Sequence, residues 1–194
     1  MSTGYYDENA DRFFADTAHA DMSQARRRFV EALAPGARIL DAGCGSGRDA
    51  LAFRQAGFEV TAFDGSAQMA RRASAHTGLE VLHLTFDQVA WREAFDGIWS
   101  CASLLHVPRA DLPGVMARLR DALVMGGVWE MSFKLGTGER QADGRHFTDL
   151  DEGRAQTLIA EVGGLETLDL TLGRDVRPGR ENEGWVNLLV RRAG

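Results

Sequence analysis

The chain alternates between short apolar runs and longer segments in which apolar residues recur every three or four positions. Short apolar runs bounded by turn residues are typical of buried strands, and the longer period is typical of amphipathic helices. The predicted strands cover residues 38–42, 58–63, 81–84, 95–101 and 128–133, and the predicted helices cover 21–33, 48–55, 66–75, 112–123 and 152–162. Two further strands are expected near residues 165–171 and 185–191.

This order of elements predicts an α/β fold. Strands that alternate with helices form parallel sheets with helices on both faces. The last two strands are joined by residues without a helical pattern, so we expect an antiparallel pair at that edge. The prediction is therefore a Rossmann-like, mostly parallel sheet of seven strands with an antiparallel edge strand.

The length of 194 residues suits one domain and is too short for two ordinary ones. No repeat or linker divides the chain, so we expect a single domain over residues 1–194. Residues 1–34 are interpreted as an N-terminal helical lid segment within it. The aromatic residues of this segment either close over a pocket or pack against the domain; they are Tyr5, Tyr6, Phe13 and Phe14.

Composition narrows the class of protein. The formal net charge is −6, which argues against a nonspecific nucleic-acid partner, because neutralising phosphates requires a surplus of Lys and Arg. Only two cysteines are present, which favours a reducing, cytoplasmic setting. The N-terminal residues lack the pattern of a signal peptide, and no apolar segment is long enough to span a membrane. We expect a monomer or homodimer that acts on a small molecule.

A glycine-rich loop follows the first predicted strand. Gly43, Gly45 and Gly47 permit positive φ angles and a close approach of backbone amides to a ligand. In parallel sheets of this type, ligands bind at the carboxyl ends of the strands. Asp64 ends the second strand, where a carboxylate can accept both hydroxyls of a ribose. A glycine loop alone also suits a plain strand-to-helix turn, but its position before a helix and the acid after the next strand favour a nucleotide-type cofactor.

Two cofactors compete for this loop. The dinucleotide fingerprint is G-x-G-x-x-G, with a pyrophosphate at the helix N-terminus. Here the glycines are spaced G-x-G-x-G, and Arg48-Asp49 occupy the region of the third glycine. Asp41 adds a negative charge that would repel a pyrophosphate and suits an ammonium group. The pattern therefore favours S-adenosylmethionine over NAD.

The loop resembles motif I of the class I S-adenosylmethionine-dependent methyltransferases, in the sequence ILDAGCGSG at residues 39–47. The sequence FDGS at 63–66, followed by Met69, is similar to the family's second-strand motif. Segments 95–99, 103–107 and 125–127 resemble the fourth strand, the loop after it and the turn before the fifth. Val124-Met125 departs from the Lys-Pro that the family often has there. The resemblance covers about residues 5–192 and is greatest toward the small tellurite-resistance (TehB-like) and methyltransferase type 11 or 12 groups.

The resemblance implies S-adenosyl-L-methionine as cofactor and S-adenosyl-L-homocysteine as product. It assigns Asp41 and Gly43 to the amino-acid end and Asp64 to the ribose. Arg48 lies outside the minimal motif and pairs either with the cofactor carboxylate or with a nearby acid. The full set of predicted cofactor-binding residues is Asp41, Gly43, Cys44, Gly45, Gly47, Arg48, Asp64, Gly65, Ser66, Met69, Phe86, Asp87, Cys101 and Ala102.

Residues after the fourth and fifth predicted strands are candidates for catalysis and substrate binding. His106 lies near the expected methyl position and is a candidate catalytic base; the alternative is a histidine that shapes the pocket. Basic residues gather after the fifth strand, which suggests either an anionic substrate or a solvated loop of mixed charge. The predicted substrate-binding residues are Tyr6, Lys134, Arg140, Arg145 and Trp185. Neither cysteine has a ligand cluster around it, so no metal is expected.

The leading hypothesis is transfer of a methyl group to a small acceptor, anionic if the basic residues bind it, such as a metabolite carboxylate, a thiol or a metalloid oxyanion. One alternative is a tRNA wobble-uridine carboxyl methyltransferase, suggested by a distant similarity at residues 145–147 and 185–187. A second alternative is a protein that binds S-adenosylmethionine without turnover, because motif I reports binding and not chemistry.

Overall fold

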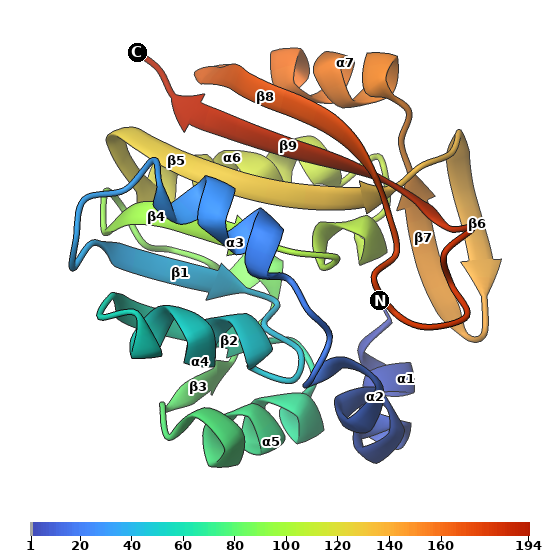
Figure 1. The fold of residues 1–194 in the computed structure, drawn as a ribbon. Helices are drawn as coiled ribbons and strands as arrows, with labels where there is room; N and C mark the ends of the chain where they lie inside the picture. The colour runs from blue at the N-terminus through green and yellow to red at the C-terminus, as the bar shows by residue number, and fades with distance from the viewer. Residues whose placement is uncertain (1) are drawn as a thin grey trace.

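A seven-stranded sheet forms the centre of the structure, a computed structural model that describes residues 2–194 (Figure 1). The strand order is β3-β2-β1-β4-β5-β9-β8. Five neighbouring strands run parallel, and β9 runs antiparallel to both β5 and the edge strand β8. The predicted fold class and the antiparallel pair at this edge are confirmed. The strands are β1 (Arg38–Ala42), β2 (Glu59–Asp64), β3 (Val81–His83), β4 (Phe95–Ser100), β5 (Leu123–Lys134), β8 (Leu165–Arg174) and β9 (Gly184–Arg192).

Helices cover both faces of this sheet. Phe29 and Phe53 pack with Trp99 on one face, while the apolar sides of two other helices pack against Trp129 on the opposite face. Gly97 makes room on the first face, because a Cβ there would lie 2.7 Å from the Phe29 ring. The helices on the first face are α3 (Ser23–Val30), α4 (Arg48–Gln55) and α5 (Ala67–Thr77); α6 (Leu112–Ala122) and α7 (Glu152–Val162) lie on the second.

Two features lie at the carboxyl ends of the parallel strands, and the first of them differs from the sequence-based expectation. The basic segment after β5, expected as a loop, forms a hairpin of β6 (Gly138–Ala142) and β7 (Arg145–Asp149). The N-terminal segment contains two short helices, α1 (Thr3–Glu8) and α2 (Ala10–Thr17). Figure 1 shows both at the end of the sheet to which β1 points. They therefore border the place where a ligand is expected.

Strand β5 is longer than predicted. It begins at Leu123, which pairs with Phe95, and the pairing resumes at Gly97 and Val128 after a shift in register. Gly126, with φ of +78°, lies in this interruption. The apolar pattern predicts only the part from Val128 onward because residues 125–126 are exposed. Among residues 2–194, no helix combines the length and apolar character needed to cross a bilayer.

Candidate functional site

The loop between β1 and α4 closes tightly against the loop after β4. Gly43 has φ of +78°, and a Cβ there would lie 2.6 Å from the Cβ of Ser103. The Gly43 and Cys44 amides both donate to the Phe63 carbonyl, which ties the loop to the end of β2. Glycine is thus required at this position both for its backbone angle and for the close contact.

Gly47 makes a packing contact that the sequence analysis did not predict. Its φ is +76°, and a Cβ would lie 2.7 Å from the methyl group of Thr77 and 3.1 Å from Ala73. It does not line the cavity at the end of the sheet. The third glycine of the loop therefore lets the start of α4 pack against α5, and its predicted contact with a cofactor has no support from this geometry.

Asp41 presents an unpaired carboxylate oxygen to the cavity. The side chain is 2% exposed, and Oδ2 has no hydrogen-bond partner among residues 2–194. Burial, reinforced by the negative charge of Asp49, raises the pKa of Asp41 well above its usual range. A buried carboxylate of this kind is costly unless a cation or donor satisfies it. The site is therefore suited to a ligand that brings a positive group to Asp41.

Asp64, at the end of β2, is held by backbone amides. Oδ2 accepts from Gly45 at 2.8 Å and Oδ1 accepts from Ser66 at 2.8 Å. Burial nevertheless raises the pKa of the Asp64 carboxyl. Each oxygen retains a further lone pair, so the carboxylate can still accept from a pair of hydroxyl groups. The neighbouring predicted residues Gly65, Ser66 and Met69 also line the cavity.

Arg48 pairs with the acid beside it. Its Nε and one terminal nitrogen lie 3.1 and 2.6 Å from the two carboxylate oxygens of Asp49. Asp49 also accepts from Arg26 at 2.6 Å and from the Trp99 indole at 3.1 Å. These partners outweigh burial and lower the pKa of Asp49. Of the two alternatives for Arg48, the structure contains the pairing with a nearby acid.

The remaining predicted cofactor residues lie on the cavity wall. Phe86 and Asp87 come from the short 3-10 helix η1 (Phe86–Gln88), and the Phe86 ring packs edge-on against Phe63. Ala102 follows β4 with φ of +54°, and its amide donates to the Ser132 hydroxyl at 2.8 Å. Burial raises the pKa of the Cys44 thiol and raises that of Cys101 to about 12. A raised pKa favours the protonated form, which is the less reactive form of a thiol.

His106 is held in a single tautomer. It ends the 3-10 helix η2 (Leu104–His106), and its Nδ1–H donates to the His146 carbonyl at 2.7 Å. A carbonyl can only accept, so Nε2 carries the lone pair and accepts from the Tyr6 hydroxyl at 2.6 Å. Burial lowers the pKa of His106 to about 4, and the charges of Arg145 and Arg140 act in the same direction. His106 is thus a neutral acceptor whose lone pair faces Tyr6.

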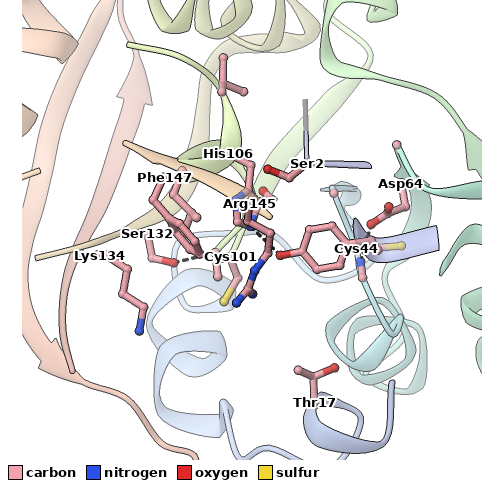
Figure 2. Close-up of a pocket in the computed structure, with 18 of the residues that line it drawn as sticks. Ser2, Thr17, Cys44, Asp64, Cys101, His106, Ser132, Lys134, Arg145 and Phe147 are labelled. Atoms are coloured by element: carbon pink, nitrogen blue, oxygen red, sulfur yellow. Dashed lines mark hydrogen bonds between the residues drawn. The ribbon is translucent and has the colours of Figure 1, made fainter. Parts of the chain in front are cut away.

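The N-terminal segment docks directly onto the cavity. Asp7 accepts from the Ser66 hydroxyl at 2.6 Å and from the Gln68 amide at 3.1 Å. On the opposite wall, the Ser2 hydroxyl accepts from the His146 amide at 3.0 Å. Tyr6 lies between these anchors, packed edge-on against the Phe13 ring. The segment therefore bridges the β2 side and the β7 side of the cavity, as Figure 2 shows for Ser2, Asp64 and His106.

Two of the predicted basic residues are neutralised by acids. Lys134 lies 3.1 Å from Asp175, pairs also with Glu183, and stands 4.0 Å from the ring centre of Trp185. Arg140 binds Asp149 with a shortest distance of 2.5 Å. All these groups line the cavity, but their charges are largely compensated within the protein. Lys134, Arg140 and Trp185 thus shape the wall more than they supply free charge.

Arg145 differs from these residues. Its Nε is buried without a hydrogen-bond partner, and its nearest acid is Asp143 at 3.4 Å. The Arg145 side chain is 13% exposed, whereas that of Asp143 is 77% exposed and open to solvent. The guanidinium carbon lies 4.6 Å from the Tyr5 ring centre and 5.1 Å from that of Phe147. Figure 2 shows Arg145 projecting toward the middle of the cavity.

These groups surround a cavity of about 1260 Å³. It is larger than the roughly 300–1,000 Å³ of common ligand sites, which leaves room for a cofactor and a second molecule. Several wall residues lie outside the predicted set; they include Ser132, Phe147, Asp175, Arg177 and Asn187. Alternation along β5 could have indicated Ser132, but the others are brought in by segments distant in sequence. No group of His, Cys, Asp and Glu residues suited to a metal ion occurs in residues 2–194.

Comparison with known proteins places the chain among related folds. Residues 39–127, from β1 into β5, match a family model described as a methyltransferase domain. A solved structure of Burkholderia thailandensis 1,6-didemethyltoxoflavin-N1-methyltransferase, with bound 1,6-didemethyltoxoflavin and S-adenosylhomocysteine, is 22% identical with a TM-score of 0.79. The match covers 98% of this chain and 85% of that chain. No curated protein matches the sequence.

Two other solved structures are similarly close in fold. A putative methyltransferase in complex with the Trm112 activator, from Haloferax volcanii, has a TM-score of 0.80 at 16% identity, and the match covers 100% of this chain and 98% of that one. The [4+2]-cyclase SpnF has a TM-score of 0.74 at 18% identity, with coverage of 98% and 94%. At these identities the likeness concerns the fold, which supports more than one chemistry.

Proposed function

We propose that this chain is a class I S-adenosylmethionine-dependent methyltransferase, and that it methylates a small acceptor held in the same cavity as the cofactor. The observation that supports the cofactor half of this proposal most strongly is the unpaired Oδ2 of Asp41. The α-ammonium of S-adenosylmethionine supplies the charge and the donors that this oxygen lacks.

The residues of the β1 and β2 ends fit the rest of the cofactor. Asp64, fixed by the Gly45 and Ser66 amides, would accept the ribose hydroxyls. Gly43 leaves open the space that a Cβ would fill beside Ser103. We assign the adenosine to the wall that contains Met69 and Phe86, and the methionine portion to the wall around Cys101 and Ala102. Arg48 would contact the cofactor only if one of its hydrogen bonds to Asp49 were replaced by a hydrogen bond to the cofactor carboxylate.

S-adenosylmethionine supplies an electrophilic methyl group, and the acceptor must bring a lone pair in line with it. Holding the two partners in this alignment accounts for much of such catalysis, about 7–11 kcal/mol in favourable cases. Another part of the cavity, here called the acceptor lobe, is lined by β5, β7, β9 and the loop before β9, with Lys134, Arg145 and Trp185 on its wall. We place the acceptor there, under the lid formed by the N-terminal segment.

His106 is proposed as the final proton acceptor when the acceptor nucleophile is protonated. The bound donor would supply the methyl carbon and keep the electron pair of its carbon–sulfur bond, so the residues of this chain would need to accept only the nucleophile's proton. The nucleophile's proton passes to the Tyr6 oxygen as the Tyr6 proton passes to Nε2 of His106. The 2.6 Å contact between Tyr6 and His106 supports this path. The His146 carbonyl stabilises the imidazolium that results.

A screen with a methyl-labelled donor tests this function. The purified chain is incubated with labelled S-adenosylmethionine and small-molecule pools, with a metalloid oxyanion arm for the tellurite-resistance resemblance and a bulk tRNA arm for the wobble-uridine alternative. Label in a small molecule supports the proposal, and label in tRNA favours the alternative. Tight binding of cofactor with no transfer to any pool would favour a protein that binds without turnover.

Variants locate the chemistry once an acceptor is found. Tyr6→Phe and His106→Asn should each lower kcat with little change in cofactor affinity, by about 10²–10⁴-fold if both act in proton transfer. The double variant should be no slower than the slower single variant, because the two residues serve one path. Additive losses, or an unchanged kcat, would contradict the proton path and leave alignment as the sole contribution of this wall.

A further inference from the structure

The charges around the acceptor lobe are unequally compensated. Lys134 faces Asp175 and Glu183, and Arg140 faces Asp149. Arg177, on the loop before β9, binds Asp175 with distances of 2.6 and 2.8 Å. Among these cations, Arg145 alone lacks a buried carboxylate partner in residues 2–194.

The groups around Arg145 leave its positive charge without a close, buried negative partner. Rings of Tyr5 and Phe147 lie within about 5 Å of the guanidinium and shield it from water. The Asp143 carboxylate is almost fully solvated, so its attraction at 3.4 Å is screened. A guanidinium is a planar donor that binds carboxylates through paired hydrogen bonds. Arg145 is thus equipped to bind one oxyanion from the cavity side.

Arg145 also acts on His106. It follows β6 on the hairpin and directly precedes His146, whose carbonyl fixes the His106 ring. The groups that face His106 are the Tyr6 hydroxyl from α1, Arg145, His146 and Phe147 from β7, and Arg140 from β6. No acid is among them, and after burial the positive charge of Arg145 is the strongest influence that lowers the pKa of His106.

We propose that Arg145 selects an acceptor with a single negative charge, and that the bound charge offsets the charge of Arg145 beside the Tyr6–His106 pair. This inference rests on the proposed function. The group bound by Arg145 is distinct from the methylated atom, because hydrogen bonds from a guanidinium draw charge from the carboxylate oxygens and make them weaker nucleophiles. The acceptor therefore combines an oxyanion with a separate O–H, N–H or S–H group that reaches Tyr6. The substrate class narrows from any small acceptor to a protonated nucleophile carrying a carboxylate-like group.

Benzoate and its neutral analogue benzamide test the charge selection in the full chain saturated with S-adenosylhomocysteine. Benzoate should bind the native chain, and Arg145→Gln should weaken this binding by about tenfold or more, the scale of one charge-assisted pair. Benzamide affinity should be the same in both. Arg109→Gln removes an equal charge outside the cavity, where Arg109 pairs with Glu161, and should leave benzoate binding unchanged.

The second readout is the titration of His106 by NMR, with His106→Asn used to assign its signal. Benzoate should raise the pKa of His106 in the native chain. In Arg145→Gln the pKa should already be raised, and benzoate should not change it further. Arg145→Lys keeps the charge and should keep the low pKa, which separates loss of charge from local unfolding.

The outcomes are distinguishable. The inference is overturned if Arg145→Gln binds benzoate as tightly as the native chain does. It is also overturned if neither benzoate nor Arg145→Gln changes the titration of His106. In both cases, normal binding of S-adenosylhomocysteine leaves the proposed function intact. Failure of the native chain to bind S-adenosylhomocysteine overturns the proposed function instead.

Discussion

Replacing Asp41 by Asn should weaken cofactor binding and stabilise the free protein. The carboxylate is buried with one oxygen unpaired, and burial raises its pKa. Asn keeps the shape and removes the charge, so the cost of burying that charge disappears from the folded state. It also removes the acceptor that we assign to the ammonium of S-adenosylmethionine. The two effects have opposite signs, which makes this substitution informative.

The expected loss of affinity follows from one charged hydrogen bond. Such a bond contributes about 1.5–3 kcal/mol, and each 1.4 kcal/mol is a factor of ten in Kd, so binding should weaken about 10- to 150-fold. Calorimetric titration with S-adenosylhomocysteine measures this directly. In native protein, an ammonium beside Asp41 favours its ionised form, so binding at a pH below the raised pKa should release a proton. Titrations in two buffers of different ionisation enthalpy detect that proton, and it should be absent in Asp41→Asn.

The pH dependence of stability gives the second measurement. A carboxyl whose pKa is raised on folding binds protons more tightly in the folded state, so its contribution to stability is present at low pH and is lost as pH rises through the raised pKa. Asp41→Asn should therefore exceed the native Tm at pH 8 by more than at pH 5. This comparison requires cofactor-free protein.

Asp49→Asn is the matched control, because Asp49 is equally buried but satisfied by Arg26, Arg48 and Trp99. It should lower stability by about 3 kcal/mol, the scale of breaking a buried pair. An Asp41→Asn protein with native affinity for S-adenosylhomocysteine would refute the assignment of Asp41. Equal destabilisation by both substitutions would show that Asp41 is structural.

Three further predictions concern the cofactor loop and the sheet. Asp64→Ala should weaken binding of S-adenosylhomocysteine strongly in calorimetry; unchanged affinity would mean that the ribose lies elsewhere. Gly43→Ala should lower the free energy of unfolding in denaturant more than Gly36→Ala does. Both glycines have similar positive φ angles, but only at position 43 would the added Cβ contact Ser103. Equal losses of stability would show that this contact has no effect. Burial raises the pKa of Glu130 to about 7 despite its pairing with Arg28, so its stabilising contribution is full below about pH 4.5 and is lost as pH rises through 7. Glu130→Gln should remove up to about 3 kcal/mol from the change in unfolding free energy with pH. An unchanged dependence of stability on pH would contradict the raised pKa of Glu130.

Much of the fold could be predicted because its signals are local. β1, α4 and α7 occupy the predicted residue ranges, since each is a run of regular pattern ended by glycine or a charged cap. The β6–β7 hairpin was missed for the opposite reason. Residues 138–141 are all exposed, so β6 carries no apolar alternation, and its pairing with β7 is stabilised by groups such as Arg140 and Asp149.

The common location of three proposed cofactor residues could also be predicted from the sequence. Asp41, Gly43 and Asp64 lie at strand ends that any parallel sheet brings together, so their common location follows from the order of elements. Spacing cannot tell a glycine that faces a ligand from one that packs against a neighbouring helix, and the structure shows Gly47 packed against Thr77. The sequence left two possible partners for Arg48, the cofactor carboxylate and a nearby acid. In the structure, Arg48 pairs with the adjacent Asp49.

The sequence by itself determined a parallel α/β sheet, a glycine loop and two acids suited to S-adenosylmethionine, because these depend on residues within a few positions of one another. Only the tertiary structure decided which charges remain free. Lys134 is neutralised by Asp175 and Glu183, which lie 41 and 49 residues away, and the His106 tautomer is set by a carbonyl 40 residues away. Electrostatic compensation depends on distance and burial in space, which no local pattern encodes, and it is what distinguishes Arg145 from its basic neighbours.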